Sequence, residues 1–211
     1  MIIAIESAST DLSVALHDAS GAIGDASWTS ARRQSAELLP RLLELLDAHG
    51  RGLDDVGAVA VGTGPGSFTG LRVAMAVAKG LALARRVPIV GVPSLPAWLE
   101  SEPDAAAAVT RAGARDAYLL ARGEDAARIV DRDDLERVLD GRRVVASSEL
   151  VDAFGLAAAI SPTGAAAAIL RIAQDRLAGS AEGDDLSRLE PIYLRAPRGV
   201  PDDQSGAVKW L

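Results

Sequence analysis

The sequence predicts an α/β fold with a partly parallel sheet, and three observations lead to this prediction. Strand-like and helix-like patterns alternate through the first hundred residues, which is the order expected of such a fold. A glycine-rich turn at 62–66 joins a strand-like segment directly to a helical one. The 211-residue chain is 49% hydrophobic and 24% charged, which is close to the globular average and excludes a mostly disordered protein. A chain of this length can bury a core for one large domain or two small ones.

The first thirty residues contain three predicted strands. The apolar run 2–5 predicts a buried strand, and 13–16 predicts its hairpin partner across the turn residues 7–11. A third strand is expected over 23–28, after a second turn. The chain therefore opens with antiparallel pairing.

The following segments alternate between helix and strand. Residues 31–49 have helical periodicity with a wide stripe of leucines, and 56–61 predict the next strand. After the turn at 62–66, an uninterrupted helical pattern runs over about 68–85, and 88–92 predict a short strand. Strand, helix, strand, helix, strand in this order indicates a sheet that is parallel in part.

The pattern weakens in the second half, where the composition changes after Pro93 and Pro96. Residues 101–108 are rich in alanine and carry little periodicity. The further elements expected are paired strands at 118–121 and 126–130, a short helix at 134–139, a strand at 144–146, a helix at 162–177 and a last ordered segment at 190–195.

Composition narrows the classes of function. The net charge of −7 gives the chain little attraction for phosphate backbones, so unassisted binding of nucleic acid is not expected. The absence of cysteine excludes disulfides, thiolate metal sites and cysteine nucleophiles. No apolar stretch approaches the roughly 20 residues that span a bilayer, and the apolar run at the start stops at Glu6 without a basic leader. We therefore expect a soluble, cytoplasmic protein without a membrane contact.

The scarcity of histidine limits catalytic and metal chemistry. Ser67 lies on a strand-to-helix turn, as some nucleophiles do, but its surroundings do not match G-x-S-x-G. Only His17 and His49 could act as an imidazole base, and neither position suggests a contact with Ser67. Two isolated histidines do not form a paired imidazole site, so we expect neither a metal nor serine hydrolase chemistry.

The glycine-rich segment 62–72 has two interpretations. Its place between a strand and a helix directs backbone N–H groups and a helix N-terminus outward, which suits an anion. The segment lacks the lysine of a Walker loop, however, and its spacing is not G-x-G-x-x-G. It is equally consistent with a tight turn, capped by Ser67 or Thr69, that lets two elements pack closely.

The two helical segments of the first half also have two interpretations. The leucine stripe within 31–49 is wider than burial against one sheet face requires, and 68–85 is apolar or small nearly all round. Both helices could fill the core, or they could present an apolar surface to a partner.

Several motifs together resemble one family. The most specific is Gly-Pro-Gly-Ser-Phe-Thr-Gly-Leu-Arg at 64–72, continued by Ala-Lys-Gly-Leu-Ala at 78–82. The others are Ile-Ala-Ile-Glu-Ser-Ala-Ser-Thr at 3–10, Leu-Ser-Val-Ala-Leu at 12–16, Glu-Leu-Leu-Pro at 37–40, Val-Gly-Val-Pro-Ser-Leu at 90–95 and Pro-Ile-Tyr-Leu-Arg at 191–195. In these motifs the chain resembles the TsaB (YeaZ) family of bacterial tRNA threonylcarbamoyladenosine biosynthesis proteins. This family is a glycoprotease-like branch of the actin-like ATPases. The resemblance covers the first hundred residues well and the second half thinly.

The resemblance implies a fold and a division of the chain. The expected fold is the actin-like ATPase (ASKHA, ribonuclease-H-like) fold, with two lobes of mixed sheets and the second lobe reduced. We accordingly expect an N-terminal lobe at 1–100 that carries the partner-binding helices, a reduced second lobe at 101–195 and a loosely ordered tail at 196–211.

The resemblance also implies a role. TsaB-like proteins pair with a metal-containing catalytic paralogue, TsaD, which transfers a threonylcarbamoyl group to adenosine 37 of tRNA, and an ATPase, TsaE, joins the pair. We therefore expect a non-catalytic scaffold subunit without protease activity that stabilises a TsaD-like paralogue, forms a homodimer in isolation and meets tRNA only through the complex. No cofactor is expected. The alternative is an independent nucleotide-hydrolysing enzyme of the same fold that binds ATP or ADP. The presence of Glu6, at a position where the family usually carries Asp, argues against this alternative.

Two sets of residues follow from the resemblance. The expected partner interface consists of Glu37, Leu38, Arg41, Leu42, Leu45, Phe68, Leu71, Arg72, Met75, Ala78, Lys79 and Ala82, with Arg72 as a polar contact at the rim. The expected vestigial nucleotide site consists of Glu6, Ser7, Thr10, Gly62, Gly64, Pro65, Gly66, Ser67, Thr69 and Gly70. We expect Met75→Asp or Ala78→Trp to block association while leaving the lobe folded.

Overall fold

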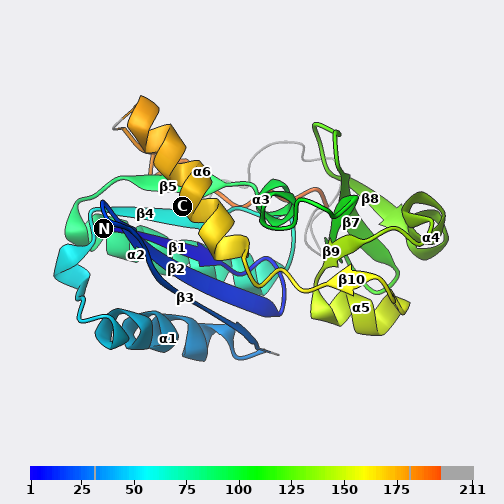
Figure 1. Ribbon diagram of the computed structural model, residues 1–211, viewed down its shortest axis with the longest axis horizontal. Helices are drawn as coiled ribbons and strands as arrows, with labels where there is room; N and C mark the ends of the chain where they lie inside the picture. Colours follow the sequence, from blue (N-terminus) through cyan, green and yellow to red (C-terminus); the bar gives the residue numbers. More distant parts are fainter. Residues whose placement is uncertain (31, 181, 196–211) are drawn as a thin grey trace.

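The computed structural model describes residues 1–30, 32–180 and 182–195, and within these ranges it contains two five-stranded sheets. Figure 1 shows the sheets side by side along the long axis of the molecule. The tail expected at 196–211 lies outside the described residues. No helix in the described ranges combines the length and the apolar character that a membrane crossing requires.

The first sheet has the predicted mixture of antiparallel and parallel strands. It consists of β1 (Ile2–Glu6), β2 (Asp11–Asp18), β3 (Gly21–Thr29), β4 (Ala58–Gly62) and β5 (Ile89–Val92), in the order β3-β2-β1-β4-β5. The pairs β1–β2 and β2–β3 are antiparallel, whereas β1–β4 and β4–β5 are parallel. The predicted mixed sheet is therefore confirmed. The strands β1, β4 and β5 are parallel because the helical crossovers between them return the chain in the same direction.

The second sheet repeats this topology with shorter strands. It consists of β6 (Ala107–Arg111), β7 (Asp116–Ala121), β8 (Arg128–Asp131), β9 (Val144–Ala146) and β10 (Ala159–Ile160), in the order β10-β9-β6-β7-β8. Its pairs β6–β7 and β7–β8 are antiparallel, and β6–β9 and β9–β10 are parallel. Thus β6 takes the place of β1, and the two sheets form the predicted actin-like ATPase, ribonuclease-H-like fold with a reduced second half.

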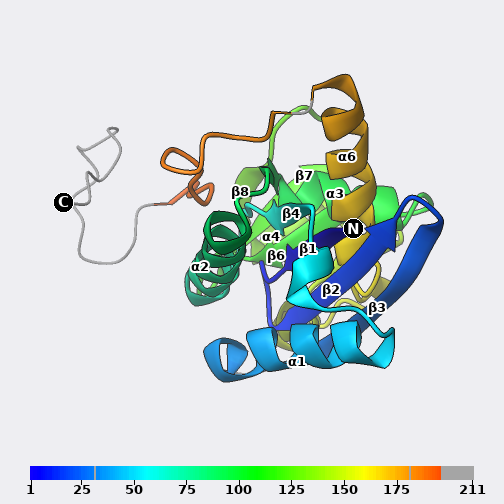
Figure 2. The ribbon, with the colours of Figure 1, turned by 90° about the vertical axis from the view of Figure 1, so that its left-hand side faces the viewer.

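Helices cover both faces of the first sheet (Figures 1 and 2). The helices α1 (Gln34–Ala48) and α2 (Phe68–Arg85) pack on one face, and α6 (Ala165–Gly179) packs on the other. Side chains of a strand alternate between faces, so Ile3 belongs to the apolar cluster under α1 and α2, whereas Ala4 belongs to the cluster under α6. Although α6 comes late in the sequence, it packs on the first sheet.

The remaining helices pack on the second sheet. The side of the sheet that carries Tyr118 faces α3 (Ser94–Ser101), and the side that carries Leu119 faces α4 (Arg132–Leu139) and α5 (Ser148–Phe154). Since α3 also contacts the first half of the molecule, one apolar cluster joins the two sheets.

Four elements were not predicted from the sequence: α3, α5, β6 and β10. The strand β6 is buried on both faces and begins with two alanines, so it lacks the alternation that reveals a strand. The expected ordered segment at 190–195 has no regular secondary structure. It is held instead by the N–H of Ile192, which donates to the Thr63 carbonyl (2.7 Å), and by an ion pair of Arg195 with Asp116 (2.7 Å).

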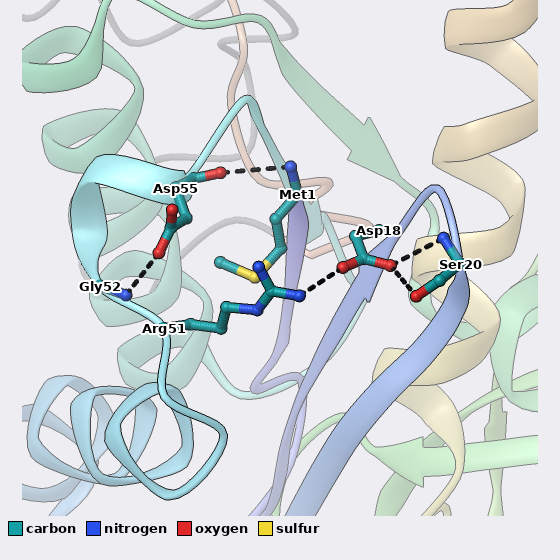
Figure 3. Close-up of polar contacts among 6 residues, drawn as sticks. All are labelled: Met1, Asp18, Ser20, Arg51, Gly52 and Asp55. Carbon is teal, nitrogen blue, oxygen red and sulfur yellow. Dashed lines mark hydrogen bonds and ion pairs between the residues drawn. The ribbon is translucent and has the colours of Figure 1, made fainter.

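A polar network ties the β2–β3 turn to the loop that follows α1 (Figure 3). Arg51 donates to the Asp18 carboxylate (2.7 Å), which also accepts from the N–H and the hydroxyl of Ser20. The Met1 ammonium donates to the carbonyl of Asp55 (3.2 Å) in the short 3₁₀ turn Leu53–Asp55. The Ser20 donors, and to a smaller extent Arg51, hold the pKa of Asp18 below its usual value.

Candidate functional site

The glycine-rich turn uses its backbone donors within the chain. The N–H of Thr63 donates to a carbonyl of β5 (2.8 Å), and the N–H of Gly64 donates to the Ser94 hydroxyl (2.9 Å). The N–H of Ser67 donates to the carbonyl of Ala8 (2.6 Å). Because the chain already satisfies these three donors, they are not available to a phosphate group.

Two glycines of this segment permit close packing against the loop between β1 and β2. A Cβ atom on Gly66 would overlap the carbonyl group of Ala8, and one on Gly70 would overlap the carbonyl oxygen of Ser7. Ser67 caps α2 by accepting a hydrogen bond from the N–H of Gly70 (3.2 Å). This geometry favours the tight-turn interpretation of the segment over the anion-binding one.

Glu6 is fully buried at the end of β1. One carboxylate oxygen accepts the N–H of Ala8 (2.5 Å), and the other lies where a Cβ on Gly62 would be and has no hydrogen-bond partner in the described structure. The Ser94 hydroxyl and the indole N–H of Trp98 lie near this carboxyl group. Burial raises the pKa of Glu6 to about 7, while Ser94 and the N–H of Ala8 oppose this shift.

The other residues of the expected nucleotide site differ in exposure. Ser7 and Pro65 are buried, Thr10 is half-buried, and Thr69 is exposed. Gly62 lies beside the Glu6 carboxyl group and Gly70 lies against Ser7, so the structure brings these members of the set together where β1, β4 and α2 meet. A carboxyl group without access to solvent is a poor ligand for a metal–phosphate complex.

Apolar packing fills the junction between the two sheets. Leu71, Leu95 and Trp98 belong to one buried cluster with Ala108 and Tyr118 of the second sheet.

One polar contact also crosses this junction. The Asp11 carboxylate at the start of β2 accepts the N–H (2.6 Å) and the hydroxyl (2.7 Å) of Ser148 at the start of α5, and it accepts the Thr29 hydroxyl (3.0 Å). The two halves are thus joined by packing and by a buried carboxylate.

The two histidines lie apart from the glycine-rich turn. His17 lies 3.4 Å from the side-chain amide of Gln174, and His49 contacts the carbonyl of Leu45 (2.9 Å). Within the described ranges, no group of three or more histidine and acidic side chains is arranged to hold a metal ion.

The structure corrects most of the predicted partner interface. Seven of its twelve residues are buried in the core of this chain: Leu38, Leu42, Leu45, Leu71, Met75, Ala78 and Ala82. They face the first sheet or the second. The prediction failed because the sequence of a helix that is apolar nearly all round does not reveal which side of the helix will be buried. Because Met75 and Ala78 are buried, their assumed exposure was wrong, and we now expect Met75→Asp and Ala78→Trp to disrupt the core rather than leave the lobe folded.

The other five predicted residues remain accessible in whole or in part. Arg41, Phe68 and Arg72 are exposed, and Glu37 and Lys79 are half-buried. Arg41 lies over the Trp28 ring (5.0 Å), and Arg72 lies over the Phe68 ring (5.1 Å).

The outward side of α2 combines small and apolar residues with two cationic ones. We define the α2 outer face as Arg72, Ala76, Lys79, Gly80 and Leu83, which follow one another at helical spacing and are exposed or half-buried. Leu83 is 69% exposed. Small side chains such as Ala76 and Gly80 allow another helix to approach closely, and Leu83 supplies apolar area to be buried.

Sequence reasoning missed Leu39, Leu43 and Leu83 as exposed apolar residues. In α1, Leu39 and Leu43 lie one residue after the buried Leu38 and Leu42. Their helical position, turned by about 100° from the buried stripe, was the signal that could have separated them from the core.

Comparisons with known proteins agree with one another. The family model described as "TsaD: tRNA N6-adenosine threonylcarbamoyltransferase" matches residues 24–151. The chain is 38% identical over 94 residues to the Escherichia coli "tRNA threonylcarbamoyladenosine biosynthesis protein TsaB", a match that covers 44% of this chain and 40% of that protein. It is also 32% identical over 186 residues to an uncharacterised Mycobacterium tuberculosis protein, which covers 85% and 83% of the two chains.

This chain is also similar to a TsaD protein and to two solved structures. A "tRNA N6-adenosine threonylcarbamoyltransferase" of Solidesulfovibrio magneticus is 46% identical over 70 residues, covering 33% of this chain and 19% of that protein. The crystal structure of a Pseudomonas aeruginosa protein with similarity to peptidase YEAZ superposes with a TM-score of 0.71 at 28% identity, covering 92% of this chain and 99% of that one. A second structure, "YeaZ from Pseudomonas aeruginosa", gives a TM-score of 0.67 at 26% identity with the same coverage.

These similarities identify the family. The matches to the named curated proteins above span less than half of their length, whereas the structural match to YeaZ extends over nearly the whole of that chain. The sequence motifs, the family model and the shared fold lead to the same assignment: the chain belongs to the TsaB (YeaZ) family, whose sequences are related to the threonylcarbamoyltransferase TsaD.

Proposed function

We propose that this chain is a non-catalytic subunit of the machinery that forms N6-threonylcarbamoyladenosine in tRNA. In this proposal the chain binds and stabilises a TsaD-like catalytic paralogue, and a TsaE-like ATPase joins the pair. The chain contacts tRNA only through this complex. The observation that carries the proposal is the exposed α2 outer face on a chain of the TsaB family.

Similarity to both TsaB and TsaD proteins supports the choice of partner. Two chains of one fold can associate through equivalent surfaces related by a pseudo-twofold axis, as identical subunits do through a true one. The α2 outer face suits such a contact, because Ala76 and Gly80 permit close helix packing and Leu83 would be removed from water. The same face could pair two copies of this chain when the paralogue is absent.

The state of the expected nucleotide site supports a non-catalytic role. Glu6 is buried, and the Ser67 hydroxyl serves as the cap of α2. Neither histidine has a described contact with Ser67. An assembly role requires none of these groups to react.

The first experiment is size-exclusion chromatography with light scattering on the chain alone and mixed with the TsaD-like paralogue of its host. The informative variant is Ala76→Arg, which places a long charged side chain on the α2 outer face. Its matched control is Ala178→Arg, at an exposed position of α6 on the opposite side of the first sheet. We expect a stable mixed complex with the wild type and the control, and at least tenfold weaker association with Ala76→Arg.

Two results would contradict the proposal. Unchanged association of Ala76→Arg would place the interface elsewhere. The absence of any mixed complex, together with Mg²⁺-dependent ATP turnover by the lone chain, would overturn the scaffold role in favour of an independent nucleotide-hydrolysing enzyme.

A further inference from the structure

The helix α2 has a local charge opposite to that of the whole chain. Residues 68–86 contain no aspartate or glutamate, whereas the chain has a net charge of −7. The cationic residues of this segment are Arg72, Lys79, Arg85 and Arg86. Arg85 is paired with Asp54, but Lys79 and Arg86 form no ion pair within the described part of the chain. The surface around Lys79 therefore carries positive charge that this chain does not balance by a direct contact.

Lys79 lies in the middle of the α2 outer face. Ala76 precedes it by three residues, Gly80 follows it directly, and Leu83 lies one turn further along the same side of the helix. The side chain of Lys79 is half-buried, which is typical of a lysine whose apolar stem lies along the protein surface and whose ammonium group reaches water. A helix that approaches closely at Ala76 and Gly80 would therefore meet this ammonium group at the centre of the contact.

This position of Lys79 opposes a contact between two copies of the chain. In a dimer with a twofold axis both copies use the same surface, so a close approach at Ala76 and Gly80 brings the two Lys79 ammonium groups together. Like charges that face each other in an interface repel and also lose hydration. The neighbouring helix α1 has exposed acidic residues, Glu44 and Asp47, but in the described structure neither forms an ion pair with α2.

The chemistry of this surface favours a protein partner over a nucleic acid. Surfaces that bind RNA concentrate cations and aromatic rings on one face. The α2 outer face instead places Lys79 among small and apolar side chains, of which Leu83 is 69% exposed. Apolar helix surfaces with a charge at the contact are typical of helix pairs in which the charge selects the partner.

We infer that Lys79 selects the partner of the α2 outer face. The helix that covers this face carries an aspartate or glutamate opposite Lys79 and small side chains opposite Ala76 and Gly80. This inference rests on the proposed function and deepens it, because it states the chemistry of the partner helix and ranks the TsaD-like paralogue above a second copy of this chain.

The first test measures the affinity of the full chain for the TsaD-like paralogue of its host by isothermal titration calorimetry. The variant is Lys79→Glu, and its control is Arg137→Glu, which makes the same change in net charge at an exposed position of α4. At about 50 mM NaCl we expect affinity at least about tenfold lower for Lys79→Glu and within about twofold of the wild type for the control. At about 500 mM NaCl the loss for Lys79→Glu should be smaller, because salt screens the charges.

The second test uses Lys79→Ala, which removes the charge and suits a helix. Analytical ultracentrifugation of the lone chain should show self-association that is several-fold tighter than that of the wild type, because the repulsion between copies is gone. The same variant should bind the paralogue several-fold less tightly. These opposite changes separate selection by charge from a loss of structure, which would weaken both associations.

The outcomes distinguish this inference from the proposed function. Wild-type affinity of Lys79→Glu for the paralogue, together with the loss expected for Ala76→Arg, would overturn selection by Lys79 and leave the proposed subunit role in place. The absence of any complex with the paralogue would overturn both.

Three further results would overturn the inference by identifying another partner or none. Weaker self-association of Lys79→Ala would show that an acidic region of a second copy covers the α2 outer face. Binding of a tRNA transcript by the lone chain, abolished by Lys79→Glu, would show that this face binds RNA. Equal self-association of the wild type and Lys79→Ala would overturn the preference for the paralogue over a second copy.

Discussion

The loop between β1 and β2 and the loop between β6 and β7 occupy equivalent places in the two sheets, yet their environments are opposite. In the first loop, Ser7 and Ala8 are fully buried and the glycine-rich turn packs directly against their carbonyl groups. In the second loop, Arg115 is exposed and the loop forms a wall of a cleft that lies between the start of α2 and the second sheet. One topological position has therefore become a packing contact in one half and an accessible surface in the other.

Topology thus determines where each loop lies, whereas packing determines whether a ligand can reach it. Trp98 and Leu71 fill the space beside the first loop with apolar side chains. The second loop is covered less completely: Ala112 packs against the same apolar cluster, but Ala114 and Arg115 are exposed and line the cleft. The predictions below test this contrast by changing one residue at a time in each region.

The largest effect is expected for Gly66→Ala. The added methyl group would overlap the backbone carbonyl of Ala8, which cannot move without displacing the first loop. We expect a loss of about 4 kcal/mol in the free energy of unfolding, measured by urea denaturation. The control is Gly80→Ala within α2, where nothing lies within 4 Å of the added atom and a gain of about 0.5–1 kcal/mol is expected. Equal stability of the two variants would show that the first loop is not tightly packed.

The second prediction concerns Glu6 and pH. Burial raises its pKa from 4.5 to about 7, so between these values the folded chain retains a proton that the unfolded chain releases. Stability should therefore fall as pH rises from about 4.5 to 7 and level off above that. Glu6→Gln cannot titrate and should be more stable than the wild type by about 3 kcal/mol at pH 8, with the curves converging near pH 4.5. Parallel stability curves for the two proteins over this range would contradict the prediction.

The third prediction concerns the contact that joins the two halves. Asp11→Ala removes the acceptor for the N–H and hydroxyl of Ser148 at the start of α5. We expect a loss of about 1–2 kcal/mol in global stability. Amide hydrogen exchange should also increase in α5 more than in α1, because α5 begins at Ser148. A uniform increase over both helices would show that Asp11 acts on the whole fold rather than on this junction.

The smallest effect is expected for Gly113→Ala in the second loop. The added methyl group would approach the end of the flexible Arg195 side chain at 3.3 Å and the Asp116 carboxylate at 4.0 Å. We expect a change in unfolding free energy of less than about 0.5 kcal/mol, in contrast to Gly66→Ala. A loss as large as that of Gly66→Ala would mean that the two loops are packed alike and that the cleft is not open.

Much of the first sheet could be predicted because its residues follow regular periods. Apolar runs at β1 and β4, the leucine repeat of α1 and the turn before α2 each predict one type of secondary structure. The strand β6 could not be predicted, since alanines buried on both faces carry no alternation. The short helix α5 contains only seven residues, too few for a helical period to stand out.

The candidate partner surface was predicted only in part. The sequence correctly singled out α1 and α2 as helices with more apolar area than usual, but it could not assign Met75 and Ala78 to the core or Leu83 to the surface. That assignment depends on the rotation of α2 against β1 and β4, which side chains far away in the sequence determine.

By itself, the sequence determined the family, the mixed topology of the first sheet and the presence of a specialised glycine-rich turn, because local periodicity and short motifs carry this information. Only the tertiary structure decided that Glu6 is buried and that α2 presents Ala76, Gly80 and Leu83 outward. It also decided that Arg111 and Arg195, 84 positions apart, line one cleft. These outcomes depend on how the two sheets pack on each other, and contacts between distant segments have no signature in the order of neighbouring residues.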